Sequence, residues 1–459
     1  MKIRTQPKTQ GGALPFALLT ASVIGFTLAS YLTLVSSQNA SVMRSLSWNH
    51  AVAVAEAGVE EALTQLHYTG ITNLWASNWK KLDNGLYYKR CALGNGTYTD
   101  VTIRPVEPPV IISTAFVPAP LSPASQMGMI LGLASSSSQP ASALKRKIQV
   151  NTAREALFTK AMLAKGQIDL NGNNVTTDSF DSTTIEGSTN GKYDPAKRRA
   201  NGDVATNSGL VDSFKMGNAN IMGHVSTGPR GTISIGSNGS VGDKKWVLED
   251  RKTGIQPGYS SDDMNVEFPD VVLPPGTPTI VYSGSYSQGN TNYNYVLKGS
   301  ATEQTFFKTS SLNGKVYVSG NVQLWITDSF NMSGGDLIYL APGANLKLYV
   351  GAASATLSGQ GISNPGSALN FQYYGLNSNT SLTFSGNGAF TGTIYAPYAN
   401  FNLKGSGSNL NDFIGASVSK TVTMTGNFNF HYDEALILIG PLKDYIVTAW
   451  NELDPNSAE

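Results

Sequence analysis

The feature that most constrains this chain is a long stretch without charge near its N-terminus. No Asp, Glu, Lys or Arg occurs from Thr9 to Met43, and residues 13–35 form an apolar run of 23 residues. As a helix, such a run spans the roughly 30 Å hydrocarbon core of a bilayer, and it is longer than the apolar core of an ordinary cleaved signal peptide. Three basic side chains precede it, which predicts an N-terminus inside and the rest of the chain outside the inner membrane. A plain single-pass anchor is the simplest interpretation.

A second apolar pattern extends this segment into a longer helix. Apolar residues recur at spacings of three and four at Trp48, Val52, Ala55, Val59, Ala62 and Leu66. This is the stripe of an amphipathic helix over residues 37–68, ending before Gly70. Together with the membrane segment over 13–36, it predicts one helix of about 55 residues, or about 80 Å. A single anchor does not need this extension, whereas a subunit that packs its helix into a filament does.

The N-terminal residues also resemble a known family. The basic leader 1–12, the apolar helix after it and the segment SLSWNHAVAVAEAGVEEALTQL are similar to the type IV pilin-like superfamily, specifically PilX-type minor pilins and pseudopilins. The resemblance implies that a prepilin peptidase cuts after Gly12, so that Ala13 becomes the first mature residue. Ala17 stands where major pilins carry Glu, which speaks against a major pilin. It also implies that other pilins are the partners, with filament-helix packing through Val52, Ala55, Val59, Ala62 and Leu66.

Residues 69–155 are typical of a small antiparallel β head, in agreement with that resemblance. The runs 86–92 and 97–103 flank a Gly-Asn-Gly turn, which is a strong hairpin signal. Six prolines between Pro105 and Pro123 predict edges and turns, because proline cannot donate a ladder hydrogen bond. A second hairpin is predicted from residues 129–133 to residues 147–150, with residues 135–138 as its loop.

The following segment, residues 156–440, predicts a right-handed parallel β-helix. Short apolar strands recur about every 20 residues, and Leu382 and Leu403, for example, lie 21 residues apart. Apolar residues alternate with Thr, Asn, Ser or Lys in each strand, and Gly and Asn supply the corners. The proline-rich residues 244–300 are predicted as an insertion, and 441–459 as a C-terminal strand and tail. The alternative is an antiparallel sandwich, but the two-residue hairpin turns of that fold are scarce.

Three short motifs carry a further resemblance, to an uncharacterised C-terminal domain found on PilX-type proteins. The pattern Gly-x-Ile-Tyr-Ala-Pro, the pattern Phe-His-Tyr-Asp-Glu and an upstream Asp-Ser-Phe-Asp-Ser contain the structural positions Tyr395, Pro397, His431, Asp433, Glu434, Asp178 and Asp181. The resemblance implies a kind of protein and no reaction.

The composition provides little material for catalysis. Charged residues are 14% of the chain and the net charge is +1, so the clustered Lys and Arg of a nucleic-acid binder are missing. A single cysteine and four histidines leave few ligands for a metal. His431 and Asp433 point to one face of a strand and Glu434 to the other, so they are interpreted as hydrogen-bonding caps. The same interpretation holds for Asp178 and Asp181, with calcium binding as the alternative. We therefore expect no catalytic residue, metal or cofactor.

These observations predict a non-catalytic, minor-pilin-like component of a type IV pilus or of a filament like that of type II secretion. Its helix would anchor first in the inner membrane and then in the filament, and its β-helix would be displayed for assembly or adhesion. The alternative is a membrane-tethered, exported β-helix protein that binds or cleaves polysaccharide. In that case exposed Tyr and Trp side chains would stack on sugars, although half or more of them are expected in the core or in ladders.

Overall fold

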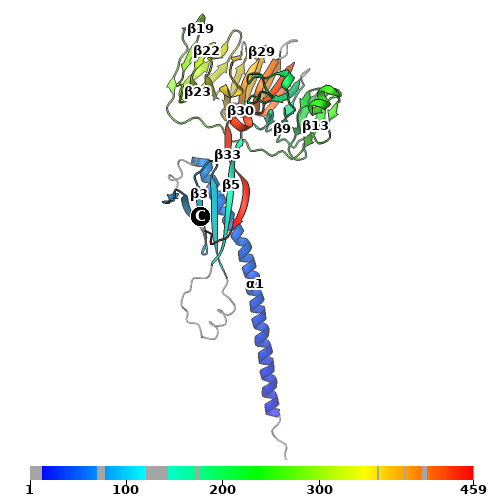
Figure 1. Ribbon diagram of the computed structural model, residues 1–459, viewed down its shortest axis with the longest axis vertical. Helices are drawn as coiled ribbons and strands as arrows, with labels where there is room; N and C mark the ends of the chain where they lie inside the picture. Colours follow the sequence, from blue (N-terminus) through cyan, green and yellow to red (C-terminus); the bar gives the residue numbers. More distant parts are fainter. Residues whose placement is uncertain are drawn as a thin grey trace, which may run out of the picture. The chain divides into compact units, whose positions relative to one another are not determined.

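The computed structural model describes residues 13–69, 78–119, 143–171, 175–358, 361–386, 389–405 and 411–457. The chain divides into two compact units (Figure 1). Unit 1 comprises residues 1–155 and 444–459, and unit 2 comprises residues 156–443. Unit 2 is therefore inserted into the sequence of unit 1. Gly12, the residue before the predicted cleavage point, lies outside the described residues.

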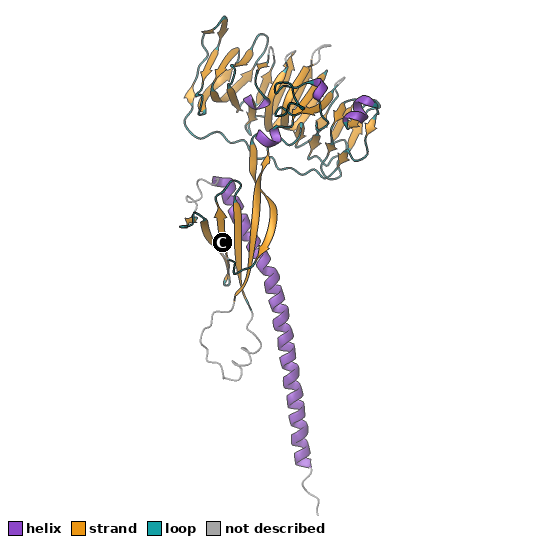
Figure 2. Ribbon diagram, viewed as in Figure 1, coloured by secondary structure: helices purple, strands orange, loops and turns teal. Residues whose placement is uncertain are grey.

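Unit 1 begins with one uninterrupted α-helix, α1 (Ala13–Thr69), drawn in purple in Figure 2. The predicted continuous helix is confirmed. The large apolar side chains of its first half are exposed, with Leu14 at 78% and Phe26 at 75%. Mean hydropathy reaches 1.8 in this helix, so by length and composition it is able to cross a membrane. Pro15 is compatible with the helix because the N–H groups of a first turn have no partner within the helix.

The second half of α1 is buried against the sheet of unit 1. Its core side chains recur at helical spacing at Ala51, Val54, Ala55, Val59, Ala62, Leu63 and Leu66. They pack with sheet residues such as Val101 and Ile111. Of the five residues assigned to filament packing, Val52 is half-buried and the other four belong to this core. Filament packing stays a prediction, and the large exposed apolar side chains of α1 lie between Leu14 and Trp48.

Gly58 marks the close approach of helix and sheet. A Cβ atom at this position would lie 2.4 Å from Ser113 Oγ and 2.8 Å from Thr99 Oγ1. These two hydroxyls are buried and lie 2.8 Å apart in a hydrogen bond. The Ala-Glu-Ala-Gly segment therefore has a local explanation, because its small residues let α1 lie against β3 (Thr97–Arg104) and β4 (Val110–Pro118).

In the described part of unit 1, the sheet has six strands in the order β1-β2-β3-β4-β5-β33. The four pairs from β1 to β5 are antiparallel. The predicted hairpin is confirmed, because β2 pairs with β3 around Gly94, Asn95 and Gly96, which all have positive φ. The C-terminal segment supplies the edge strand β33. The other strands have the bounds β1 (Lys80–Lys81), β2 (Tyr87–Gly94), β5 (Ala143–Ala156) and β33 (Leu442–Leu453).

The prediction that prolines confine residues 105–123 to edges and turns is wrong. β4 is a central strand between β3 and β5. The prolines flank the strand instead of interrupting it, since residues 110–117 contain none and keep their N–H donors, and Pro118 ends the strand. The predicted second hairpin begins at residues 129–133, which lie outside the described residues. Its predicted return strand belongs to β5, which pairs with β4.

Unit 2 is built of short strands with parallel pairing. Among the described residues, every ladder of unit 2 is parallel except the hairpin of β18 (Tyr286–Gln288) and β19 (Thr291–Tyr293), so the antiparallel sandwich is excluded. Strand partners recur at the predicted period of about 20 residues. Leu382 pairs with Phe401, and Phe401 pairs with Val422.

The strands of unit 2 form three rows. Row A contains, in stacking order, β17 (Thr279–Ile280), β21 (Thr305–Leu312), β23 (Asn321–Asn331), β25 (Asn345–Val350), β28 (Phe371–Gly375), β30 (Phe390–Gly405), β31 (Asn411–Thr425), β6 (Met162–Ala164), β9 (Val204–Thr206), β12 (Val225–Ser226) and β16 (Ser260–Ser261). Row B runs from the ends of β21 and β23 through β26 (Ser354–Leu357), β29 (Ser381–Gly386), the ends of β30 and β31, β7 (Ile168–Asp169), β10 (Phe214–Gly217) and β13 (Ile233–Ile235).

Row C is interrupted. Its first part contains β20 (Tyr295–Lys298), β22 (Lys315–Ser319), β24 (Leu337–Leu340) and β27 (Ile362–Ser363). Its second part contains the starts of β30 and β31, then β32 (Phe428–Asp433), β8 (Thr176–Phe180), β11 (Asn220–Met222), β14 (Ser240–Gly242) and β15 (Gly254–Ile255). Among the residues that the structure describes, unit 2 also contains four short helical segments, η2 (Pro195–Lys197), η3 (Lys245–Glu249), η4 (Ala368–Asn370) and α3 (Leu436–Ile439).

The stacking order differs from the order in the sequence. β31 pairs with β6 and β7, and β32 pairs with β8, so the last turn of unit 2 lies on its first turn. In Figure 1 the orange strands β29 and β30 are followed along the body by the green strands β9 and β13. β16 and β17 follow each other in the chain but lie at opposite ends of row A.

Residues 262–278, which we call the strap, connect these two ends across row A. Met264 N donates to Thr227 O near one end, at 2.9 Å. Pro269 O accepts from Tyr395 Oη in the middle of the row, at 2.7 Å. The strap lies within the predicted insertion 244–300, and its prolines favour an extended chain without a ladder of its own.

Aromatic side chains stack from turn to turn, inside and outside the body. Inside, the ring centroids of Phe390 and Phe413 are 4.4 Å apart, and those of Phe413 and Phe430 are 4.3 Å apart. Outside, Tyr349 and Tyr374 stack with centroids 5.2 Å apart. These ladders therefore occupy several of the aromatic faces considered for sugar stacking.

Candidate functional site

Two of the sequence motifs meet where the first and last turns of unit 2 pair. The parallel register of β8 and β32 sets His431 opposite Asp178. His431 Nδ1 lies 2.5 Å from Asp178 Oδ1, and the two side chains are 4% and 2% exposed. The stacking order thus brings together side chains that are 253 positions apart in the sequence.

A second carboxylate faces the other ring nitrogen of His431. Nε2 lies 3.6 Å from Asp412 Oδ1 and has no hydrogen-bond partner among the described residues. Burial by itself lowers the pKa of His431, but the hydrogen bond to Asp178 and the negative charges of Asp178 and Asp412 outweigh it, so the pKa is raised. The interaction with His431 lowers the pKa of Asp412 in turn. The arrangement therefore favours an imidazolium held between two carboxylates.

Tyr193 covers this pair from the loop that follows β8. Its hydroxyl donates to Asp178 Oδ2 at 2.6 Å, and its ring stacks on His431 with centroids 3.6 Å apart. Phe180 contacts the same ring edge-on. Burial, and next the negative charge of Asp178, raise the pKa of the Tyr193 hydroxyl, which therefore stays protonated as a donor. Arg198 Nε adds a positive charge 3.8 Å from Asp178 Oδ2.

The Asp433 side chain accepts hydrogen bonds from backbone N–H groups. Its Oδ1 accepts the N–H of Ser182 at 3.1 Å and the N–H of Ala435 at 3.2 Å. His431 and Asp433 are each 3% exposed, while Glu434 is half-buried. Burial raises the pKa of Asp433 in spite of its hydrogen bonds.

Glu434 and Asp181 share one arginine. Arg199 Nη1 lies 2.9 Å from Glu434 Oε2 and 3.4 Å from Asp181 Oδ2. Glu434 Oε1 also accepts from Ser179 Oγ at 2.7 Å. Asp181 Oδ1 accepts from the backbone and the hydroxyl of Thr183. The motif carboxylates thus fasten the loop after β8 to the end of β32.

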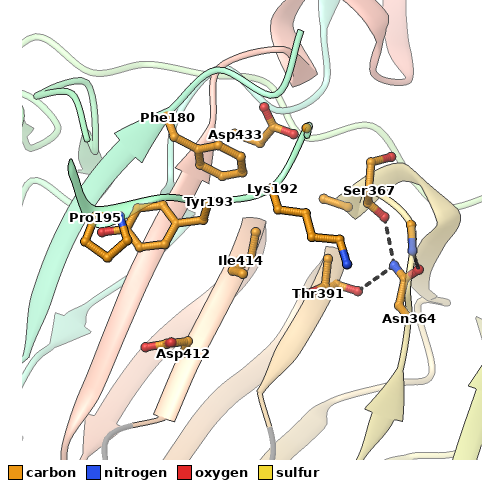
Figure 3. Close-up of a pocket in the computed structure, with 13 residues that line it drawn as sticks. Phe180, Lys192, Tyr193, Pro195, Asn364, Ser367, Thr391, Asp412, Ile414 and Asp433 are labelled. Carbon is orange, nitrogen blue, oxygen red and sulfur yellow. Dashed lines mark hydrogen bonds between the residues drawn. The ribbon is translucent and has the colours of Figure 1, made fainter. Parts of the chain in front are cut away.

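A cavity of about 360 Å³ opens beside Tyr193 (Figure 3). The loop after β8, the turn 364–368 and strands β30 and β31 line it. Figure 3 shows Lys192 extending from the loop into this space toward Thr391, with Asp412 on the side of Tyr193. Asn190 and Gly191 have positive φ, and Thr189 and Lys192 exchange backbone hydrogen bonds across them, so a tight turn presents Lys192.

The wall of the cavity opposite the loop is held rigidly. Asn364 Nδ2 donates to Ser367 O at 2.7 Å and to Thr391 O at 3.0 Å, and its Oδ1 accepts from Gly366 N at 2.9 Å. This one amide therefore ties the turn 364–367 to strand β30. This part of the cavity wall is therefore ordered without a ligand.

The Ile-Tyr-Ala-Pro motif fastens the strap. Tyr395, which is buried, donates to Pro269 O at 2.7 Å, and Tyr398 donates to Asp270 Oδ1 at 2.7 Å. Pro397 is buried at the corner where the register of β30 and β31 shifts. Lys165 Nζ lies 4.2 Å from the centre of the Tyr398 ring. Tyr395 and Pro397 therefore lie on a different row from the His431 cluster.

Three residues of this region were not identified from the sequence. Tyr193, Lys192 and Asp412 belong to no motif, and Asp412 reaches His431 only through the pairing of β31 with β32. The Asn-Gly dipeptide at 190–191 is the one local signal, because it predicts a tight turn. Among the residues that the structure describes, no group of three or more His, Cys, Asp or Glu side chains is placed to hold a metal ion.

Part of this chain is similar in sequence to an uncharacterised domain family. Residues 286–438 match the model described as Domain of unknown function (DUF7305), which is less than half of the chain. Among solved structures, the competence-associated pilin ComZ from Thermus thermophilus is similar at 11% sequence identity, over 89% of this chain and 97% of that chain, with a TM-score of 0.23. A TM-score this low does not establish a shared fold. The comparison with curated proteins gave no match.

Proposed function

We propose that the protein is a non-catalytic, minor-pilin-like subunit of a type IV pilus or of a filament like that of type II secretion. The observation that carries the proposal is the division of α1 within unit 1. Its first half exposes large apolar side chains such as Phe16 and Leu28, while its second half is core. An exposed apolar helix requires either a bilayer or neighbouring helices around it. A filament subunit meets both environments in turn.

The N-terminal sequence supports the same proposal. The apolar helix begins directly after the Gly-Gly pair at 11–12, where the resemblance to PilX-type minor pilins sets the peptidase cleavage point. The partners would be other pilins and the prepilin peptidase. The protein would reside in the inner membrane with its C-terminal part outside and reach the cell surface as part of a pilus.

We also infer that unit 2 is a right-handed parallel β-helix displayed for assembly or adhesion. Three rows of parallel strands and partner spacings near 20 residues support this inference. We infer the right-handed sense because connections between parallel strands of one sheet are right-handed in the great majority of proteins.

N-terminal sequencing of the membrane-extracted protein tests the filament role. The proposal expects Ala13 as the first residue, and it expects Gly12→Val to leave the leader uncut while Gly11→Val is still processed. An intact Met1 in the wild type, or cleavage near residues 36–38, would contradict it.

A further inference from the structure

We propose that the cavity beside Tyr193 binds a neutral, polyhydroxylated ligand, namely a sugar unit of a glycan. Its volume of about 360 Å³ lies within the range of small-molecule sites. The proposal does not depend on the filament role, because it concerns a site within unit 2 alone.

The polar groups of the cavity are of two kinds. Asn364 and Asp433 are already hydrogen-bonded to the chain and form the fixed wall. The Lys192 ammonium and the Thr391 hydroxyl have no hydrogen-bond partner within the described part of the chain, although both line the cavity. Asp412, 43% exposed, accepts one hydrogen bond from Asn429, at 3.1 Å, through Oδ1, which leaves Oδ2 available. The Lys192 ammonium and the Thr391 hydroxyl can therefore donate hydrogen bonds to a ligand, and Asp412 Oδ2 can accept one.

The charges of the cavity select against anions and simple cations. The lining contains one lysine and the two carboxyl groups of Asp412 and Asp433, so a phosphate or a uronate meets no excess of positive charge. Among the described residues no group of three or more His, Cys, Asp or Glu side chains is placed to hold a metal ion, and the cavity lining contains two carboxyl groups. A sugar hydroxyl, in contrast, both donates and accepts, so different hydroxyls of one sugar can bind the ammonium and the carboxylate that line this cavity.

The cavity is also preorganised, which lowers the entropic cost of binding. Tyr193 is fixed by its hydrogen bond to Asp178 and by the stack on His431. The lining combines apolar side chains such as Phe180 and Ile414 with polar ones such as Thr391, which suits the apolar C–H groups and the hydroxyls of a sugar. The His431 cluster thus acts as a positioning element for the cavity wall.

The test uses the full chain in detergent with neutral hexose and N-acetylhexosamine oligosaccharides of two to four units, and with uronate oligosaccharides as the acidic arm. Calorimetry or ligand-observed NMR should give dissociation constants of about 10 µM to 1 mM for at least one neutral oligosaccharide. Lys192→Met and Asp412→Asn should each weaken binding about tenfold or more, because each removes a hydrogen bond to a charged group.

The matched controls are Lys298→Met and Asp263→Asn, two exposed residues outside the cavity, which should leave binding unchanged. Lys192 is exposed on a turn, so its variant tests the site even where Asp412→Asn disturbs His431. The proposal is overturned by no binding of any neutral oligosaccharide, by binding of uronates only, or by equal affinity in all four variants. Because processing at Gly12 is not involved, failure here leaves the filament role standing.

Discussion

His431 Nδ1 lies 2.5 Å from Asp178 Oδ1, across a gap of 253 positions in the sequence. The pair links the last turn of unit 2 to its first, because β32 and β8 are neighbours in row C. Tyr193 and Asp412 surround it with a further donor and a further charge. We call this contact between the first and last turns the closure of unit 2, and its contribution to stability can be measured directly.

His431→Gln should lower the free energy of unfolding of unit 2 by about 3 kcal/mol or more, since it removes the positive charge in direct contact with the buried Asp178 carboxylate, while Arg198 Nε is farther away, at 3.8 Å. Hydrogen exchange of unit 2 peptides in urea would measure the loss. His224→Gln is the matched control, because the His224 side chain is 48% exposed and its contact with Asp203 is screened by solvent. Equal losses in both variants would contradict a special role for His431.

The raised pKa of His431 gives the closure a pH dependence. A base with a higher pKa in the folded state contributes stability that is complete below its unfolded pKa of about 6.5 and is lost as the pH rises through the folded pKa. Unit 2 should therefore unfold at a lower urea concentration at pH 8.5 than at pH 6. Burial raises the pKa of Asp433, so this group also contributes less stability as the pH rises. The difference in stability between the two pH values should shrink in His431→Gln and persist in Asp433→Asn. If His431→Gln leaves the difference unchanged, the pH dependence comes from another group.

Gly58→Ala should destabilise unit 1 by about 1–3 kcal/mol, as expected for overpacking. The new methyl group would meet Ser113 Oγ at 2.4 Å and Val101 Cγ2 at 2.8 Å. Gly25→Ala is the control in the same helix, because a Cβ there meets nothing within 4 Å. Thermal unfolding of unit 1 should show a lower midpoint for the first variant only. An unchanged midpoint for Gly58→Ala would mean that helix and sheet are less closely packed.

The sequence predicted elements better than their arrangement. The helix and the β2–β3 hairpin depend on local patterns of apolar residues and turn residues, so both could be identified. The central position of β4 could not, because a proline count says nothing about the proline-free residues between the prolines. The period of the parallel strands was visible, while the pairing of Leu382 with Phe401 depends on corner lengths.

The candidate site was predictable only in part, for a related reason. The motif residues Asp178 and His431 were visible as motifs, but their contact requires the first and last turns to pair. No short-range sequence pattern specifies the order in which the turns stack. Tyr193 and Asp412 join the cluster through the same long-range pairing, so nothing in their neighbours in the sequence marks them.

Tyr398→Phe should loosen the strap. The change removes the hydrogen bond from the Tyr398 hydroxyl to Asp270 Oδ1. Limited proteolysis within residues 262–278 should then be faster, in proportion to the opened population. Tyr282→Phe is the control, since that side chain is 75% exposed. Equal cleavage rates in the two variants would show that the hydrogen bond does not hold the strap.

The stacking order itself is testable by cross-linking. Thr176 and Asn429 are register partners in β8 and β32, and adjacent strand positions bring Cα atoms within the roughly 4.4–6.8 Å that a disulfide needs. In a chain with Cys91→Ala, the double variant Thr176→Cys with Asn429→Cys should therefore oxidise to one intramolecular disulfide, detected by mass spectrometry of the digested protein. The control pair Ser260→Cys with Thr279→Cys should not cross-link, because β16 and β17 lie at opposite ends of row A although they are consecutive in the chain. A body whose turns stacked in sequence order would give the reverse result, since its first and last turns would then be the ones farthest apart.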